Sequence, residues 1–160
     1  KPSSAASDVY KRQSIICAIV AVGIIIFLRY RAPKIAVPVI ITGLSEVLII
    51  LGVAALIGWT IDLPAIAGII AAVGTGVDDQ IVITDEKTKH EKEMRSIKAR
   101  LKRAFFIIFT AYFTTVGAMI PLSFVGAGAV KGFAITTIIG VTIGVLITRP
   151  AYARILQYID

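Results

Sequence analysis

Residues 63–86 read LPAIAGIIAAVGTGVDDQIVITDE, a stretch of apolar and small side chains that contains the adjacent acids Asp78 and Asp79. A helix needs about 20 such residues to cross a bilayer. An ionised Asp near the centre of a spanning helix costs roughly 2.5–3.5 kcal/mol on insertion scales. Acids that remain there usually face a bundle interior or a water-filled path. The stretch therefore predicts a transmembrane helix whose two acids are either costly or functional.

The rest of the chain is similarly apolar. It has 160 residues, of which 57% are hydrophobic, and a mean hydropathy of +0.87. The long runs are apolar all round, which is typical of helices in a membrane rather than of helices on a soluble domain. We expect an all-α membrane protein built as a bundle of five transmembrane helices within residues 14–160. The predicted spans are 14–28, 35–58, 64–84, 105–125 and 130–147.

The first thirteen residues do not fit this pattern. They are polar, and SSAASDVYKRQ at residues 3–13 is what one reading frame of a common transposase sequencing adapter encodes. We therefore expect residues 1–13 to be a non-native, disordered segment with almost no contacts to the bundle. The alternative is a genuine disordered leader. The shortness of the first span, 14–28, agrees with an adapter that replaces its beginning.

Basic residues indicate the orientation. Of the fourteen Lys and Arg after residue 13, thirteen fall on one side of the predicted spans, and only Lys131 falls on the other. The chain is then expected to start outside and to end in the cytoplasm, with Pro33 and Pro150 at helix ends. Its net charge of +7 is explained by the positive charges on the cytoplasmic side. These charges predict membrane lipids rather than nucleic acid as partners. The basic stretch 85–104 predicts an amphipathic surface helix or a solvated charged loop, with Met94 among its apolar positions.

Three acids and several hydroxyls fall at similar depths. From the helix rise, Glu46 lies roughly 18 Å from the outer end of its span, and Asp78 and Asp79 lie roughly 21–23 Å from theirs. Four hydroxyl groups of the fourth span share this level: Thr110, Tyr112, Thr114 and Thr115. No Lys or Arg falls within a predicted span, so low dielectric and mutual repulsion disfavour the ionised acids. Such a layer can load and release a proton, or it can simply hydrogen-bond neighbouring helices.

Small residues mark close packing. Gly74 and Gly76 lie on the two acidic faces of the third span, which we therefore place at the centre of the bundle. Gly140 and Gly144 have GxxxG spacing, and we expect this surface to stay uncovered for a partner protein. The sequence contains no metal set, nucleophile arrangement or phosphate loop, so we expect neither an enzyme nor a cofactor.

Three segments resemble the membrane half of the archaeal-type SecD branch of the SecD/SecF family, within the resistance-nodulation-division superfamily. They are residues 63–86, GAGAVKGFAITTIIG at 126–140 and TRPAYARIL at 148–156. The resemblance implies that Asp78 is the family's membrane aspartate and that Gln80 stands at the family's Asn. Residues 110–115 read TAYFTT where bacterial members have a DANLTT-like stretch. This departure suggests that acidity moved to Asp79 and Glu46.

The resemblance also implies a function. With SecF, such a subunit couples the proton gradient to polypeptide translocation through the SecY translocon of a prokaryotic cell membrane. The family's first helix and its extracytoplasmic domain, which would contact the translocating polypeptide, would lie upstream of Ser14. We expect Asp78 inside the bundle, facing the fourth and fifth spans, with Thr114 or Tyr112 within reach. The alternatives are a proton-coupled transporter of small molecules or lipids from the same superfamily, and a scaffold for SecY assembly.

Overall fold

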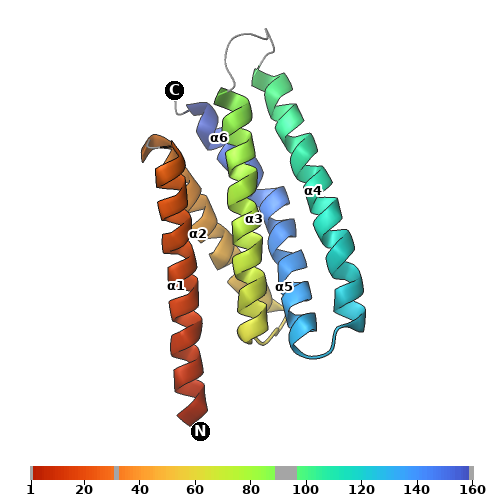
Figure 1. Ribbon diagram of the computed structural model, residues 1–160. Coiled ribbons are helices and arrows are strands. Elements are labelled where there is room, and N and C mark those ends of the chain that lie inside the picture. The colour runs from red at the N-terminus through yellow and green to blue at the C-terminus, as the bar shows by residue number, and fades with distance from the viewer. Residues whose placement is uncertain (1, 31–32, 89–96, 159–160) are drawn as a thin grey trace.

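The computed structural model describes residues 2–30, 33–88 and 97–158 and shows a bundle of helices (Figure 1). The helices are α1 (Pro2–Tyr30), α2 (Pro33–Leu56), α3 (Leu63–Thr88), α4 (Ile97–Val125), α5 (Ala129–Ile143) and α6 (Arg149–Tyr158). A π-helical turn, η1 (Gly144–Thr148), joins α5 to α6. The described residues contain no strand, so the predicted all-α fold is confirmed.

The beginning of α1 differs from the sequence prediction. Residues 1–13 were expected to be disordered, but α1 is helical from Pro2 onward. A helix extends readily once its first turns have formed, because each added residue gains one hydrogen bond. Val9 and Tyr10 nevertheless remain 62% and 64% exposed, so this segment packs little against the bundle. Its origin as an adapter stays a prediction.

Four helical stretches are long and apolar enough to cross a membrane, among the described residues. They are Pro33–Leu56, Leu63–Lys87, Ile97–Val125 and Ala129–Tyr158. The described ends of the predicted segment 85–104 continue α3 and α4 rather than forming a separate element, and Met94 lies outside the described residues. Asp62 begins α3 as an N-cap, since its carboxylate accepts a hydrogen bond from the Ala65 N–H at 2.8 Å.

The sequence predicted a helix end at Pro150, but the helix continues past this residue. Proline lacks an N–H and its ring clashes with the carbonyl four residues earlier, which disfavours a regular α-helix, although α2 and α4 continue past Pro38 and Pro121. The chain instead widens into η1, in which the Arg149 N–H bonds the Gly144 carbonyl, and then continues as α6. Beyond this wider turn, Arg149, Tyr152, Ala153 and Leu156 are buried within the bundle.

α3 is central, as predicted: it contacts α1, α2, α4, α5 and α6 (Figure 1). It packs most closely on α5, where a Cβ added at Gly140 would lie 2.4 Å from the Ala72 Cβ. The expectation that Gly140 and Gly144 stay uncovered is wrong, because both are buried within this chain. The GxxxG surface is buried by other helices of this chain, so it is not available to a partner protein.

Candidate functional site

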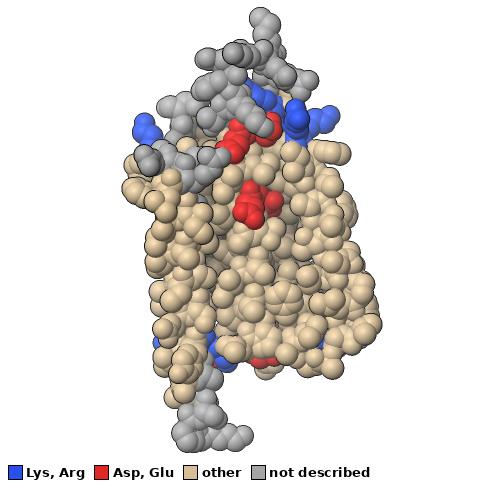
Figure 2. All heavy atoms as spheres, viewed as in Figure 1, with Lys and Arg blue, Asp and Glu red and all other residues tan. Residues whose placement is uncertain are grey.

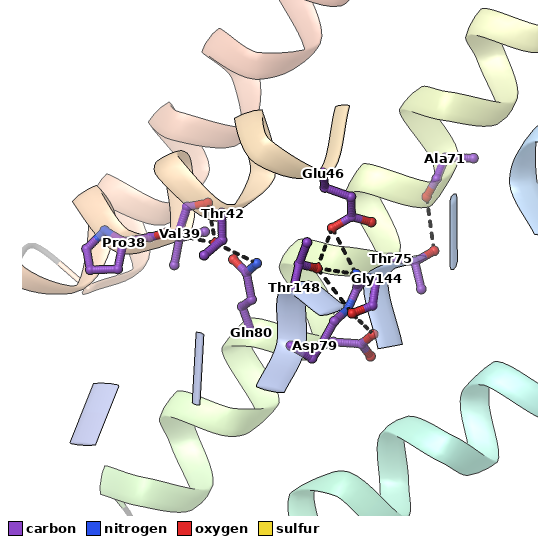
Figure 3. A network of polar contacts seen from close by, with 11 residues as sticks. Pro38, Val39, Thr42, Glu46, Ala71, Thr75, Asp79, Gln80, Gly144 and Thr148 are labelled. Carbon is purple, nitrogen blue, oxygen red and sulfur yellow. Dashed lines mark hydrogen bonds and ion pairs between the residues drawn. The ribbon is translucent and has the colours of Figure 1, made fainter. Parts of the chain in front are cut away.

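Inside the bundle, one arginine binds two acids from different helices, Glu46 and Asp79, which Figure 3 labels together with Thr148. The Arg149 side chain is completely buried. Its Nη1 donates to the Glu46 Oε2 from α2 at 2.8 Å, and its Nε donates to the Asp79 Oδ2 from α3 at 3.0 Å. Charged groups removed from water need partners of this kind, because an unpaired buried charge is far more costly than a paired one. We call these three residues the Arg149 cluster.

Thr148 adds a hydroxyl to the cluster. Its Oγ1 donates to the Glu46 Oε2 at 2.9 Å and lies 2.9 Å from the donating Arg149 Nη1. Thr148 also lies 3.2 Å from the carbonyl oxygen of Gly144, in the π-helical turn. The turn therefore presents two consecutive side chains to the same carboxylate.

Two glycines leave room for the guanidinium. A Cβ at Gly144 would lie 1.6 Å from the Arg149 Nη1, and a Cβ at Gly76 would lie 2.8 Å from Nη2 and 3.1 Å from the Glu46 Oε2. Any side chain at Gly144 would thus displace the arginine. Gly74 differs, since a Cβ there would meet nothing within 4 Å. Of the four glycines singled out from the sequence, Gly76 and Gly144 line the Arg149 cluster.

This arrangement corrects one sequence expectation. Arg149 was placed on the cytoplasmic side, and the spans were expected to hold no cation, but Arg149 is inside and pairs with two of the three predicted acids. The π-helical turn is the physical reason, because it carries the helix past Pro150. With both acids ionised, the cluster carries one negative charge in excess. Among the described atoms, Glu46 Oε1 and Arg149 Nη2 are buried without a hydrogen-bond partner.

Asp78 lies elsewhere. Its side chain is exposed, whereas the next residue, Asp79, is buried. Figure 2 shows acidic atoms surrounded by the tan surface over α3, a short way below the charged end of the bundle. The expectation that Asp78 lies inside the bundle, facing α4 and α5, is therefore wrong. Consecutive residues on a helix point about 100° apart, so one acid faces inward and the other outward.

The hydroxyls of α4 do not join the acids. Thr110 and Thr114 are exposed and donate to carbonyls of their own helix, those of Phe106 and Thr110. Tyr112 lies 3.2 Å from the Thr142 hydroxyl of α5 instead. Thr115 is half-buried beside a groove of about 500 Å³ along the outside of α4. The groove is lined by Phe106, Ile107, Thr110, Ala111, Thr114 and Thr115.

A second polar line continues from the cluster toward the basic end of α3. Gln80 donates to the Thr42 hydroxyl at 2.9 Å, and the Thr84 hydroxyl lies 2.7 Å from that of Tyr152. Sequence reasoning did not assign these contacts. The spacing of Gly76, Gln80 and Thr84 at every fourth position was the available signal, because such residues share one helix face. Among the described residues, no group of three or more His, Cys, Asp or Glu side chains could hold a metal ion.

Comparison with known proteins decides the family. The sequence model described as "Protein export membrane protein SecD/SecF, C-terminal" matches residues 6–158. The chain belongs to the SecD/SecF family. Its SecD relatives include the "Protein-export membrane protein SecD" of Methanocaldococcus jannaschii, with 60% identity over 144 residues, or 90% of this chain and 36% of the relative. The SecD of Thermococcus gammatolerans is 54% identical, over 94% of this chain and 30% of the relative.

The archaeal SecD resemblance seen in the sequence is thus confirmed, and the chain spans about a third of the length of these curated SecD proteins. A solved structure agrees on the fold. The crystal structure of SecDF, a translocon-associated membrane protein from Thermus thermophilus, matches with a TM-score of 0.81 at 22% identity. The match covers 95% of this chain and 21% of the SecDF chain. This chain is therefore a SecD-type membrane bundle within the protein-export family.

Proposed function

We propose that this chain is the membrane part of a SecD-type accessory subunit that, with SecF, couples the proton gradient to polypeptide translocation. Family membership and the archaeal SecD relatives support the role in protein export. Coupling requires a group in the membrane that can gain and lose a proton. Glu46, Asp78 and Asp79 are the three acids at that depth, and their surroundings differ.

The observation that carries the proposal is the exposed position of Asp78 within a helix long and apolar enough to span a membrane, where the neighbouring Asp79 and Gln80 are buried. An ionised carboxylate facing lipid tails is costly, and intramembrane acids usually face protein or water. Since this chain does not cover Asp78, we assign the covering surface to SecF. Protonated, Asp78 can donate a hydrogen bond; ionised, it needs water or a cation, and this difference can shift the balance between two helix arrangements.

Glu46 and Asp79 have another role in this proposal. Both are held by Arg149 through hydrogen bonds of 2.8 and 3.0 Å. Acids that are already paired with a buried cation are less free to exchange a proton than an acid at an open face. They join α2, α3 and the π-helical turn into one unit, so that a change at Asp78 moves this unit as a whole.

The assembly follows from the same placement. The chain would lie in a prokaryotic cell membrane with its basic end in the cytoplasm, next to SecF and the SecY translocon. The polypeptide would be contacted by a domain outside these 160 residues. The sequence of the longer relatives leaves room for such a domain, because the chain spans 36% of the Methanocaldococcus jannaschii SecD.

The decisive experiment uses a full-length SecD that contains this bundle, together with SecF, in vesicles that export a polypeptide. Asp78→Asn should abolish the stimulation of export by a proton gradient while SecF binding is retained. Asp62→Asn is the matched control, because it removes one acid from the same helix yet keeps a side chain that can cap Ala65. Wild-type stimulation in the Asp78→Asn protein would overturn the proposal.

A further inference from the structure

A recess of about 460 Å³ lies at the basic end of the bundle, away from the Arg149 cluster and from Asp78. It is lined by Lys87 near the end of α3, by Ile97, Lys98 and Leu101 in the first turns of α4, and by Gln157 near the end of α6. We propose that this recess binds the phosphate-bearing headgroup of an anionic membrane lipid. The proposal does not depend on the function proposed above.

The lining combines the two chemistries that such a lipid presents. Lys98 brings an ammonium group, and Gln157 brings an amide that can donate to phosphate oxygens, whereas the Lys87 ammonium at the same opening already donates to the Leu156 carbonyl. Ile97 and Leu101 supply apolar surface at the same opening, where a glycerol backbone and the first methylenes would lie. A soluble phosphate has no apolar part that could contact these two side chains. The volume falls within the range of ordinary ligand sites.

The helix ends around the recess also suit an anion. The recess lies beside the first described turn of α4, which carries Lys98, Arg100 and Lys102. The carbonyl ends of α3 and α6 would oppose an anion, but they are engaged by cations. Lys87 donates to the Leu156 carbonyl of α6, and Arg100 donates to the Lys87 carbonyl at 3.0 Å.

The position along the helices is that of a lipid headgroup. All three lining elements belong to stretches long and apolar enough to span a membrane, and the recess lies at the end of the bundle where α4 carries Lys98, Arg100, Lys102 and Arg103. Figure 2 shows the blue atoms gathered at that end of the molecule. Acids are present nearby too, since Asp85 and Glu86 precede Lys87 in α3. Basic pockets between helices on the cytoplasmic side are known to hold anionic headgroups.

The test compares two lysines of one helix. The chain in detergent micelles is titrated with phosphatidylglycerol, with phosphatidylcholine and with inorganic phosphate, and bound lipid is counted by native mass spectrometry. Lys98→Gln should weaken phosphatidylglycerol binding about fivefold, the effect of one lysine near a membrane phosphate. Lys102→Gln is the matched control, because Lys102 is exposed on the same helix but does not line the recess. Lys98→Arg should retain binding.

Each other outcome overturns the proposal. Equal weakening by Lys98→Gln and Lys102→Gln would mean general surface charge rather than a site. Equal binding of phosphatidylcholine would remove the anionic preference. Inorganic phosphate that binds as well as the lipid, with the same dependence on Lys98, would assign the recess to a free phosphate. Helix content measured by circular dichroism establishes that each variant is folded.

Discussion

Asp79 and Asp78 are neighbours in α3 and have opposite surroundings: the Asp79 carboxylate lies 3.0 Å from the buried Arg149 Nε, whereas the Asp78 carboxylate is exposed. One helix thus presents a neutralised acid to the interior and an open acid to whatever covers the bundle. A single helix can connect the two, because a shift of α3 that moves one residue also moves the other.

Arg149 should be essential to the stability of the bundle. Arg149→Leu leaves two acids buried without their cation, and removing one partner of a buried pair costs about 3–5 kcal/mol. Unfolding of the chain by a denaturing detergent, followed by circular dichroism, would measure the loss. The triple variant with Glu46→Gln and Asp79→Asn should recover most of it, since neutral amides need no cation. A triple variant as unstable as Arg149→Leu would contradict the charge argument.

Glycine substitutions should destabilise the bundle where the glycine lies against the Arg149 guanidinium, and not at other helix positions. Gly144→Ala places a Cβ 1.6 Å from the Arg149 Nη1, and such overpacking costs about 1–3 kcal/mol. Gly74→Ala is the control in α3, where the added methyl meets nothing within 4 Å. It should be neutral or stabilise the helix by about 0.5–1 kcal/mol. Equal stability of the two variants in detergent unfolding would mean that Gly144 is not needed to make room for the Arg149 guanidinium.

The Thr148 hydroxyl should also contribute. Thr148→Val removes a donor to the Glu46 Oε2 and an acceptor for the Arg149 Nη1, so both buried groups lose a partner. The expected destabilisation is about 1–3 kcal/mol. Thr136 offers a matched control, because it is buried to the same degree but bonds only carbonyls of its own helix. If Thr136→Val is the more damaging change, Thr148 is not a member of the network.

The face around Asp78 should be protected by SecF. In a Cys17→Ser background, Asp78→Cys should react with a membrane-permeant maleimide when the chain is alone in micelles, because the position lies on an exposed face of the apolar part of α3. Addition of SecF should slow the reaction severalfold. Leu48→Cys provides the comparison, since Leu48 is 69% exposed on α2. Protection of Leu48→Cys with none at Asp78→Cys would place the partner on another surface.

Most of the helical architecture could be predicted because apolar runs separated by charged segments define it. Glu46 and Asp79 could be found from depth alone, and the central position of α3 from its small residues. Arg149 could not, because a basic residue followed by proline is typical of a helix end. Its burial depends on a π-helical turn, and that turn is stabilised by contacts from α2 and α3 that no local pattern contains.

The Arg149 cluster also orders events during synthesis. Glu46 and Asp79 precede their arginine by 103 and 70 residues, and chains are made from the N-terminus onward. α2 and α3 consequently enter the membrane before Arg149 has been made. Glu46 and Asp79 therefore lack their cationic partner until the last helix is inserted. Arrival of Arg149 is then the step that completes the bundle. A chain interrupted before that residue therefore holds Glu46 and Asp79 without the cation that pairs with both of them.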